Sequence, residues 1–339
     1  MYENQEIIGN TPMIKINYKY NGKVKNVFAK LEYFNITGSI KDRVVFYIIN
    51  NAKKRGLLKE KMPIVEATSG NTGIALSALG AYYNHPVYIF MPDWVSKERI
   101  NLMQGYGAKV ILISREDGGF IKCVNESKKL AKEINGFLAN QFENNDNYLA
   151  HYETTGKEII NQISDKIGGF VSGVGTGGTL MGVGDRLKEK YNDIIITAIE
   201  PDKMPILSGG KVTGQHKIEG IGDDFIPKLV SKSKIDKIMQ INDDDAINMS
   251  RRLSKQLGLG VGISSGANLI GSILLADEIE DNVVTVFADD NKKYLSTDLF
   301  KDINNDNKDF ISNKVQLISY EFLRKFTFKF KELKILLWC

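Results

Sequence analysis

Helical and strand patterns alternate along the first half of the chain, and this alternation limits the possible folds more than any other feature. The expected strands are residues 63–67, 86–91, 109–113 and 137–140. The expected helices begin at Lys41 and Asn71 and cover residues 96–106 and 120–134. Strands and helices that alternate in this way form a parallel sheet with helices on both faces. The sequence therefore predicts an α/β fold.

The second half repeats the alternation. Its expected helices are 152–164, 179–189 and 244–257, and its expected strands are 169–173, 194–200 and 283–288. Near the N-terminus, residues 13–16 and 27–32 have strand patterns, and Asn21-Gly22 between them predicts a hairpin turn. Ligands in open α/β sheets bind beyond the carboxyl ends of strands. Polar segments at those ends are therefore the candidates for function.

Lys41 follows the turn Asn35-Ile36-Thr37-Gly38-Ser39 and precedes an apolar run at 44–49. Ser39 is a good N-cap, so we expect Lys41 in the first turn of a helix. There the helix dipole and any neighbouring cation lower the pKa of an amine, which suits a lysine that attacks a carbonyl. Taken alone, a solvated lysine after a helix cap is the simpler interpretation.

Two polar turns follow predicted strands and open predicted helices. Residues 68–73 are Thr-Ser-Gly-Asn-Thr-Gly, whose free backbone N–H groups and hydroxyls suit a carboxylate. Residues 173–179 are Gly-Val-Gly-Thr-Gly-Gly-Thr, where missing side chains let backbone amides close around a phosphate. Both turns are candidate anion sites.

The second turn has a rival interpretation as a dinucleotide fingerprint. Gly173, Gly175 and Gly178 have the G-x-G-x-x-G spacing, and Glu200 lies where a ribose-binding acid belongs. An NAD-binding dehydrogenase would use these residues. That interpretation explains neither Lys41 nor the 68–73 turn, and such a fingerprint normally opens its domain.

In this order and with these separations, the three segments resemble the fold-type II pyridoxal-phosphate (PLP) enzymes, specifically the cysteine synthase and cystathionine β-synthase group. The resemblance extends from about Ile8 to about Phe300. It implies two three-layer α/β domains of the tryptophan synthase β-subunit kind. The smaller, mobile domain would comprise 1–12 plus 35–144 and the larger 13–34 plus 145–300. Residues 301–339 form a C-terminal tail that matches no motif of the family.

The resemblance also implies a role for each residue of its motifs. Lys41 would hold the cofactor as an internal aldimine and act as general base, and Asn71 would bond the cofactor's ring hydroxyl. The cofactor phosphate would lie on Gly175, Thr176, Gly177, Gly178 and Thr179, and the pyridine nitrogen on Ser264. The substrate carboxylate would lie on Thr68, Ser69, Gly70, Thr72 and Gln141.

Ser264 bears on the kind of chemistry. A neutral hydroxyl at the pyridine nitrogen limits the ring as an electron sink, which favours β-elimination through an aminoacrylate over transamination. Ser264 can also serve as a helix cap before residues 268–270. The segment His151-Tyr152-Glu153-Thr154-Thr155-Gly156 resembles another family motif, and we expect it to have a structural role.

Asp223 is the informative departure from the family pattern. Cysteine synthases usually have G-I-G-A-G-F-I-P where this chain has Gly-Ile-Gly-Asp-Asp-Phe-Ile-Pro at 220–227. A carboxylate ~5 Å from an incoming hydrosulfide would oppose it by about 3 kcal/mol, whereas a carboxylate can activate water or hold the ammonium group of a thiol substrate. We therefore expect catalysis by Asp223 in the sulfide-releasing direction, from L-cysteine to L-serine or a thioether. The alternatives are a cysteine synthase in which Asp223 points to solvent, and a catalytically silent binding partner.

Composition excludes several other classes. Two cysteines, Cys123 and Cys339, and three scattered histidines predict neither a disulfide framework nor a metal site. The 45 Lys and Arg against 41 Asp and Glu are scattered until the C-terminus, so we expect no nucleic-acid partner and no membrane partner. We expect a cytoplasmic protein that acts on a small amino acid, and the resemblance implies a homodimer. The basic aromatic run at 322–331 is expected to pack on its own domain or on a second subunit rather than on a membrane.

Overall fold

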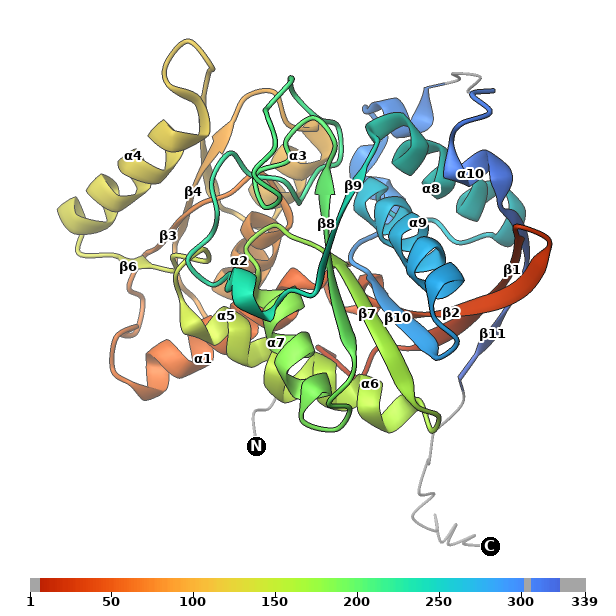
Figure 1. The fold of residues 1–339 in the computed structure, drawn as a ribbon. Coiled ribbons are helices and arrows are strands. Elements are labelled where there is room, and N and C mark those ends of the chain that lie inside the picture. The colour runs from red at the N-terminus through yellow and green to blue at the C-terminus, as the bar shows by residue number, and fades with distance from the viewer. Residues whose placement is uncertain (1–6, 302–305, 324–339) are drawn as a thin grey trace, which may run out of the picture.

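The computed structural model describes residues 7–301 and 306–323. Its strands form two separate sheets, one of four strands and one of seven, and helices cover both faces of each (Figure 1). The fold is therefore α/β with two layered units, as the sequence predicts.

The four-stranded sheet is parallel throughout and has the order β5-β4-β3-β6. Its strands are β3 (Ile64–Ala67), β4 (Val87–Pro92), β5 (Lys109–Ile113) and β6 (Phe137–Leu138). Its helices are α1 (Lys41–Lys54), α2 (Asn71–Tyr82), α3 (Lys97–Gly105) and α4 (Gly119–Glu133). Ile64 packs with the first three helices and Val65 with α4, so β3 is buried on both faces.

The seven-stranded sheet has the order β11-β1-β2-β10-β7-β8-β9. Its strands are β1 (Met13–Tyr20), β2 (Lys23–Leu31), β7 (Ile167–Gly173), β8 (Ile195–Pro201), β9 (Lys237–Ile241), β10 (Asn282–Phe287) and β11 (Gln316–Phe322). β1 is antiparallel to both of its neighbours, and the remaining pairs are parallel. Asn21 and Gly22 both have positive φ, 48° and 79°, which confirms the predicted hairpin turn.

Six helices accompany the larger sheet. They are α5 (Asn145–Ala150), α6 (Gly156–Gln162), α7 (Gly178–Lys188), α8 (Asp243–Leu257), α9 (Ile263–Glu278) and α10 (Ile311–Lys314). α8 and α9 share a hydrophobic cluster with one face of the sheet, and α6 and α7 share another with the opposite face. The predicted helix at 152–164 differs: Asn144 caps a helix that begins at Asn145, and a π-helical stretch at His151–Thr155 interrupts it.

Part of the C-terminal tail belongs to this sheet. β11 pairs antiparallel with β1, and α10 is capped by Asp245, which accepts from the backbone N–H groups of Ile311 and Ser312. The described part of the tail, residues 306–323, therefore packs on its own chain. The rest of the basic aromatic run, 324–331, lies outside the described residues.

The predicted domain boundaries stay a prediction, although the sheets divide the chain in a similar way. The smaller sheet uses strands between residues 64 and 138, and the larger uses strands on both sides of that segment. Within the described part of the chain, no helix is long and apolar enough to cross a membrane.

Candidate active site

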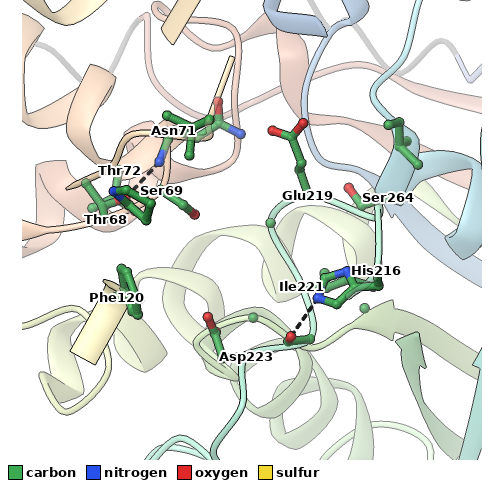
Figure 2. A pocket seen from close by; sticks show the side chains of 18 of the residues that line it. Thr68, Ser69, Asn71, Thr72, Phe120, His216, Glu219, Ile221, Asp223 and Ser264 are labelled. Carbon is green, nitrogen blue, oxygen red and sulfur yellow. Dashed lines mark hydrogen bonds between the residues drawn. The ribbon is translucent and has the colours of Figure 1, made fainter. Parts of the chain in front are cut away.

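A cavity of about 990 Å³ opens where the carboxyl ends of β3, β7 and β10 come together. Figure 2 shows the 68–72 turn on one side of it and Ser264 and the 216–223 loop on the other. Thirteen of the predicted site residues line it: Lys41, Thr68, Ser69, Gly70, Asn71, Thr72, Gln141, Gly175, Thr176, Gly177, Thr179, Asp223 and Ser264. Gly178 does not line it, because it lies behind the loop as the first residue of α7.

Lys41 is the first residue of α1, as predicted, but the predicted cap is wrong. The N-cap position belongs to Ile40, and no side chain caps the helix. The Oγ of Ser39 accepts a 3.2 Å hydrogen bond from the backbone N–H of Lys41. The turn is held by the carboxylate of Asp42, which accepts from the backbone N–H of Thr37 at 2.9 Å. The buried carboxylate of Asp42 therefore holds this turn together with the Ser39 hydroxyl, which lies one residue before the N-cap position.

The pKa of Lys41 is lowered, in the predicted direction, but the cause differs. Burial disfavours the ammonium, while the carboxylates of Asp289 and Asp223 act in the opposite sense. Among the described residues, the charged groups that act on this lysine are these two carboxylates. The amine is thus both desolvated and held close to two potential proton acceptors.

Thr72 and Gln141 meet at the edge of the cavity, although they come from different elements. Thr72 Oγ1 donates to Gln141 Oε1 at 2.6 Å. The backbone N–H of Gln141 donates to Glu66 Oε2 at 3.0 Å, and Glu66 is buried in β3 with a pKa raised by burial to about 7. Glu66 therefore holds the backbone of Gln141 in place. The sequence analysis did not identify this residue.

The glycine turn is closely packed from behind. Asn147 Nδ2 donates to Thr176 Oγ1 at 2.8 Å, and a Cβ on Gly178 would lie 2.0 Å from Asn147 Oδ1. A Cβ on Gly175 would lie 2.4 Å from the carbonyl oxygen of Gly220. Since α7 begins at Gly178, its free N–H groups face the turn. The turn thus has the form of an anion cradle.

His151 supports the same cradle. Its Nδ1 lies 3.0 Å from Thr155 Oγ1 and its Nε2 lies 3.2 Å from Thr179 Oγ1. Burial, with the positive charges of Lys41 and Arg43, lowers the pKa of His151 well below its ordinary value. A neutral imidazole therefore links the π-helical stretch to the last residue of the cradle.

Ser264 is buried as the second residue of α9, after an N-cap at Gly262, so its predicted use as a cap is wrong. Beside it, Asn268 accepts from the backbone N–H of Gly173 and donates to the carbonyl of Val286, both at 2.8 Å. Asn268 thereby ties α9 to the carboxyl ends of β7 and β10.

Asp223 is half-buried at the cavity, whereas Asp224 is exposed. Burial raises the pKa of Asp223 to about 6, with a further rise from Asp224 and an opposing effect from Lys41. The loop is fixed by Gly222, whose N–H donates to Val174 O at 2.9 Å and whose carbonyl lies 2.8 Å from His216 Nε2 (Figure 2).

The polar groups of this cavity that were not predicted include Asp289 and Arg99. Asp289 accepts a 2.7 Å hydrogen bond from Asn71 Nδ2. Arg99 of α3 forms an ion pair with Glu219, and its guanidinium lies 4.6 Å from the ring of Tyr294. Only the position of Asp289, directly after a predicted strand, could have identified it from the sequence.

The cavity suits pyridoxal phosphate. Among the described residues, nothing hydrogen-bonds to the buried Asn71 Oδ1. This polar atom, the desolvated Lys41 and a cradle where a Cβ on Gly175 would collide are features that a phosphate-bearing aldehyde would use. The residues present therefore fit the group.

Comparisons with known proteins agree with this geometry. The family model "Pyridoxal-phosphate dependent enzyme" matches residues 5–289. A cysteine synthase from Staphylococcus aureus is 42% identical over 300 residues, which is 87% of this chain and 96% of that protein. A hydrogen sulfide-producing enzyme from Fusobacterium nucleatum has a TM-score of 0.90 and 47% identity, over 94% of this chain and 97% of that chain.

An aspartate-to-asparagine mutant of that hydrogen sulfide-producing enzyme, in a lysine-dimethylated form, has been solved with an α-aminoacrylate intermediate. That structure has a TM-score of 0.89 and 47% identity, over 93% of this chain and 96% of that chain. The family model matches most of the chain, and the similarity to the cysteine synthase from Staphylococcus aureus extends over nearly the whole of that protein. The chain therefore belongs to the pyridoxal-phosphate dependent enzymes, within the cysteine synthase family.

Proposed function

We propose that this PLP-dependent β-replacement enzyme releases hydrogen sulfide from L-cysteine and adds water, giving L-serine, or a second thiol, giving a thioether. The observation that carries the proposal is the position of Asp223 at the cavity that Lys41 also lines. The similarity to a hydrogen sulfide-producing enzyme supports the same direction.

We assign the remaining residues from the geometry and the family resemblance. Lys41 would hold the cofactor, Asn71 its ring hydroxyl and Ser264 its ring nitrogen, and the residues Gly175, Thr176, Gly177, Gly178 and Thr179 would hold its phosphate. The substrate carboxylate would lie on Thr68, Ser69, Gly70, Thr72 and Gln141. The N-terminus of α2 supports this, because its free N–H groups open toward the same cavity.

The reaction balances as L-cysteine plus water to L-serine plus hydrogen sulfide. Bound PLP supplies an electron sink that makes the α-proton acidic and lets the β-substituent leave. Lys41, as a free amine, takes the α-proton, the C–S bond breaks, and the sulfur leaves with its own proton as hydrosulfide, which takes up the proton that Asp223 removes from water in the next step and becomes hydrogen sulfide. Asp223 then takes a proton from water as its oxygen bonds to the β-carbon, and Lys41 returns a proton to the α-carbon.

Asp223 discriminates between the possible nucleophiles by its charge. With a pKa of about 6, its carboxyl group is mostly ionised at neutral pH. A hydrosulfide anion ~5 Å away would be opposed by about 3 kcal/mol, on the order of a hundredfold. Water is neutral and suffers no such penalty. The same carboxylate would also attract the ammonium group of an amino-acid thiol.

A cysteine synthase, making L-cysteine from O-acetyl-L-serine and sulfide, is the second candidate. The 42% identity to a cysteine synthase favours it. In that case Asp223 should be without influence on the reaction. Its half-buried position, beside an exposed Asp224, supports the sulfide-releasing direction instead.

The two candidates are separated by comparing substrates. The parent enzyme and Asp223→Ala are each given L-cysteine alone, and then O-acetyl-L-serine with sulfide, and kcat/KM is measured for each. We expect sulfide release by the parent, its loss in Asp223→Ala, and a gain of cysteine synthesis in that variant. A parent that makes cysteine efficiently, releases no sulfide and ignores Asp223→Ala would establish the second candidate.

We also propose that the enzyme acts as a homodimer. Ile7, Phe34 and Ile36 are each about half exposed and line one shallow hollow. An apolar surface of this kind suits a self-complementary contact about a twofold axis. Light scattering that gives the monomer mass of 38.0 kDa at micromolar concentration would contradict the proposal.

A further inference from the structure

Asp289 is a buried carboxylate at the cavity that the proposed reaction does not use. It follows β10 directly and is 1% exposed. Its Oδ2 accepts two hydrogen bonds, from Asn71 Nδ2 at 2.7 Å and from the hydroxyl of Tyr294 at 2.8 Å. Within the described part of the chain, its other oxygen, Oδ1, is buried without a hydrogen-bond partner.

The backbone places this carboxylate at the junction of three functional segments. Ser39 forms an isolated bridge with Asp289, and Ile40 N–H donates to Ala288 O at 2.8 Å, so the turn before Lys41 is bound to the end of β10. Gly262 N–H donates to Asp289 O at 3.1 Å, which joins the start of α9 to the same point. Movement of Asp289 would therefore displace the Lys41 turn and the helix that carries Ser264.

The hydrogen bond to Asn71 determines which way the amide faces. An ionised carboxylate only accepts hydrogen bonds, so the NH₂ group of Asn71 must face Asp289. The second N–H of that group and the unpartnered Oδ1 remain for a ligand. If Asp289 were replaced by a residue that does not accept, the amide would lose this fixed orientation.

The second contribution of Asp289 to the site is its negative charge close to Lys41. Lys41 is faced by Asp289, Asp223 and the neutral His151, and the two carboxylates favour a proton on its nitrogen. Asp289 itself is faced by Lys41, Asn71, the carboxylate of Asp290 and Tyr294, and the hydroxyl of Tyr294 also interacts with the guanidinium of Arg99.

We propose that Asp289 is a positioning residue for the cofactor: it fixes the amide of Asn71 and supplies the buried negative charge that retains a proton on the nitrogen through which Lys41 holds the cofactor. The inference rests on the proposed role of Lys41. It adds a residue that the motifs of the family resemblance do not include.

Asp289→Asn tests the charge, since it keeps the shape and an accepting oxygen. The visible absorbance of the holoenzyme is titrated with pH, with Asp290→Asn as the matched control. The carboxylate of Asp290 lies against Gly38 and interacts with Lys293. Because Asp289→Asn removes a nearby negative charge, the midpoint of its absorbance titration should be about one pH unit lower than in the parent. The absorbance of Asp290→Asn should titrate like that of the parent.

Asp289→Ser tests the anchoring of Asn71. The apoenzyme is reconstituted with PLP, and we expect a dissociation constant about tenfold higher than that of the parent. Tyr294→Phe, which leaves the bond to Asn71 in place, should keep the parent value. An unchanged midpoint in Asp289→Asn together with an unchanged dissociation constant in Asp289→Ser would overturn the inference.

Lys41→Ala separates this failure from failure of the proposed function. If Lys41→Ala loses the titrating absorbance while Asp289→Asn behaves like the parent, only the role of Asp289 is wrong. If Lys41→Ala keeps that absorbance, the assignment of Lys41 is wrong.

Discussion

Thr72 Oγ1 donates a 2.6 Å hydrogen bond to Gln141 Oε1, and this bond joins the start of α2 to the turn after β6. The same amide donates to the carbonyl of Ala67 at 3.3 Å, so Gln141 spans the anion turn. Both side chains line the cavity where we place the substrate carboxylate.

Gln141→Ala should therefore weaken substrate binding more than catalysis. We expect KM for L-cysteine to rise about tenfold, the loss of one to two hydrogen bonds, with a smaller change in kcat. Steady-state kinetics on holoenzyme with parental cofactor content would measure this. A variant with the parent's KM would remove Gln141 from the substrate site.

Sulfide release should depend on the ionisation of Asp223. Its pKa is raised by burial to about 6, so the carboxylate that accepts a proton from water is lost as the pH falls through that value. The rate at saturating L-cysteine should rise through pH 6, and Asp223→Asn should remove that limb. Asp224→Asn is the matched control, because its carboxylate is exposed. Asp224→Asn should keep the rise in rate and move its midpoint to a slightly lower pH, since it removes a like charge beside Asp223. A rise in rate through pH 6 that survives in Asp223→Asn would contradict the assignment.

Gly178→Ala should weaken PLP binding by displacing the residues that form the phosphate cradle. A Cβ there would lie 2.0 Å from Asn147 Oδ1, and Asn147 also holds Thr176 of the cradle. We expect the dissociation constant for PLP to rise at least tenfold. Gly105→Ala is the control, because a Cβ at Gly105 meets nothing within 4 Å. Equal affinities in the two variants would show that the cradle tolerates the displacement.

A buried ion network next to Lys41 should contribute to stability. Arg43 pairs with Glu32 and Glu158, and Lys30 also pairs with Glu158. Burial alone would raise the pKa of Glu158, but the charges of Arg43 and Lys30 hold it at about 2. Its stabilising effect is thus present above the ordinary carboxyl pKa of 4.5 and is lost as the pH falls toward 2.

Glu158→Gln should lower the free energy of unfolding at neutral pH by about 3 kcal/mol, because it leaves buried charges unpaired. Chemical denaturation would measure it. Glu153→Gln removes surface pairs with Lys157 and Arg186 and should cost less than about 1 kcal/mol. Similar losses in both variants would contradict the burial argument.

The sequence predicts much of the fold because its signals are local. The Asn21-Gly22 turn, the strand at 109–113 and the two polar strand-to-helix turns depend only on neighbouring residues. β9 and β11 were missed because both lie at edges of the sheet, where polar residues such as Lys237 and Gln316 interrupt the apolar pattern. Their positions depend on pairing with distant strands.

The cavity could be predicted only in part for the same reason. The motifs predict that Lys41 and the two anion turns belong to one site, since each lies at the end of a strand or the start of a helix. The bond between Asn71 and Asp289 joins residues 218 positions apart. The only local signal for Asp289 is its position directly after a predicted strand, and no local pattern indicates that Asp223 is half-buried while Asp224 is exposed.

The central claim is that water, activated by Asp223, replaces the thiol of L-cysteine. The most direct measurement is to incubate the holoenzyme with L-cysteine in water enriched in heavy oxygen and to analyse the products by mass spectrometry. We predict L-serine with one heavy oxygen in its side chain, formed in a one-to-one ratio with hydrogen sulfide. Absence of labelled serine, in an enzyme preparation that makes cysteine from O-acetyl-L-serine and sulfide, would contradict the claim.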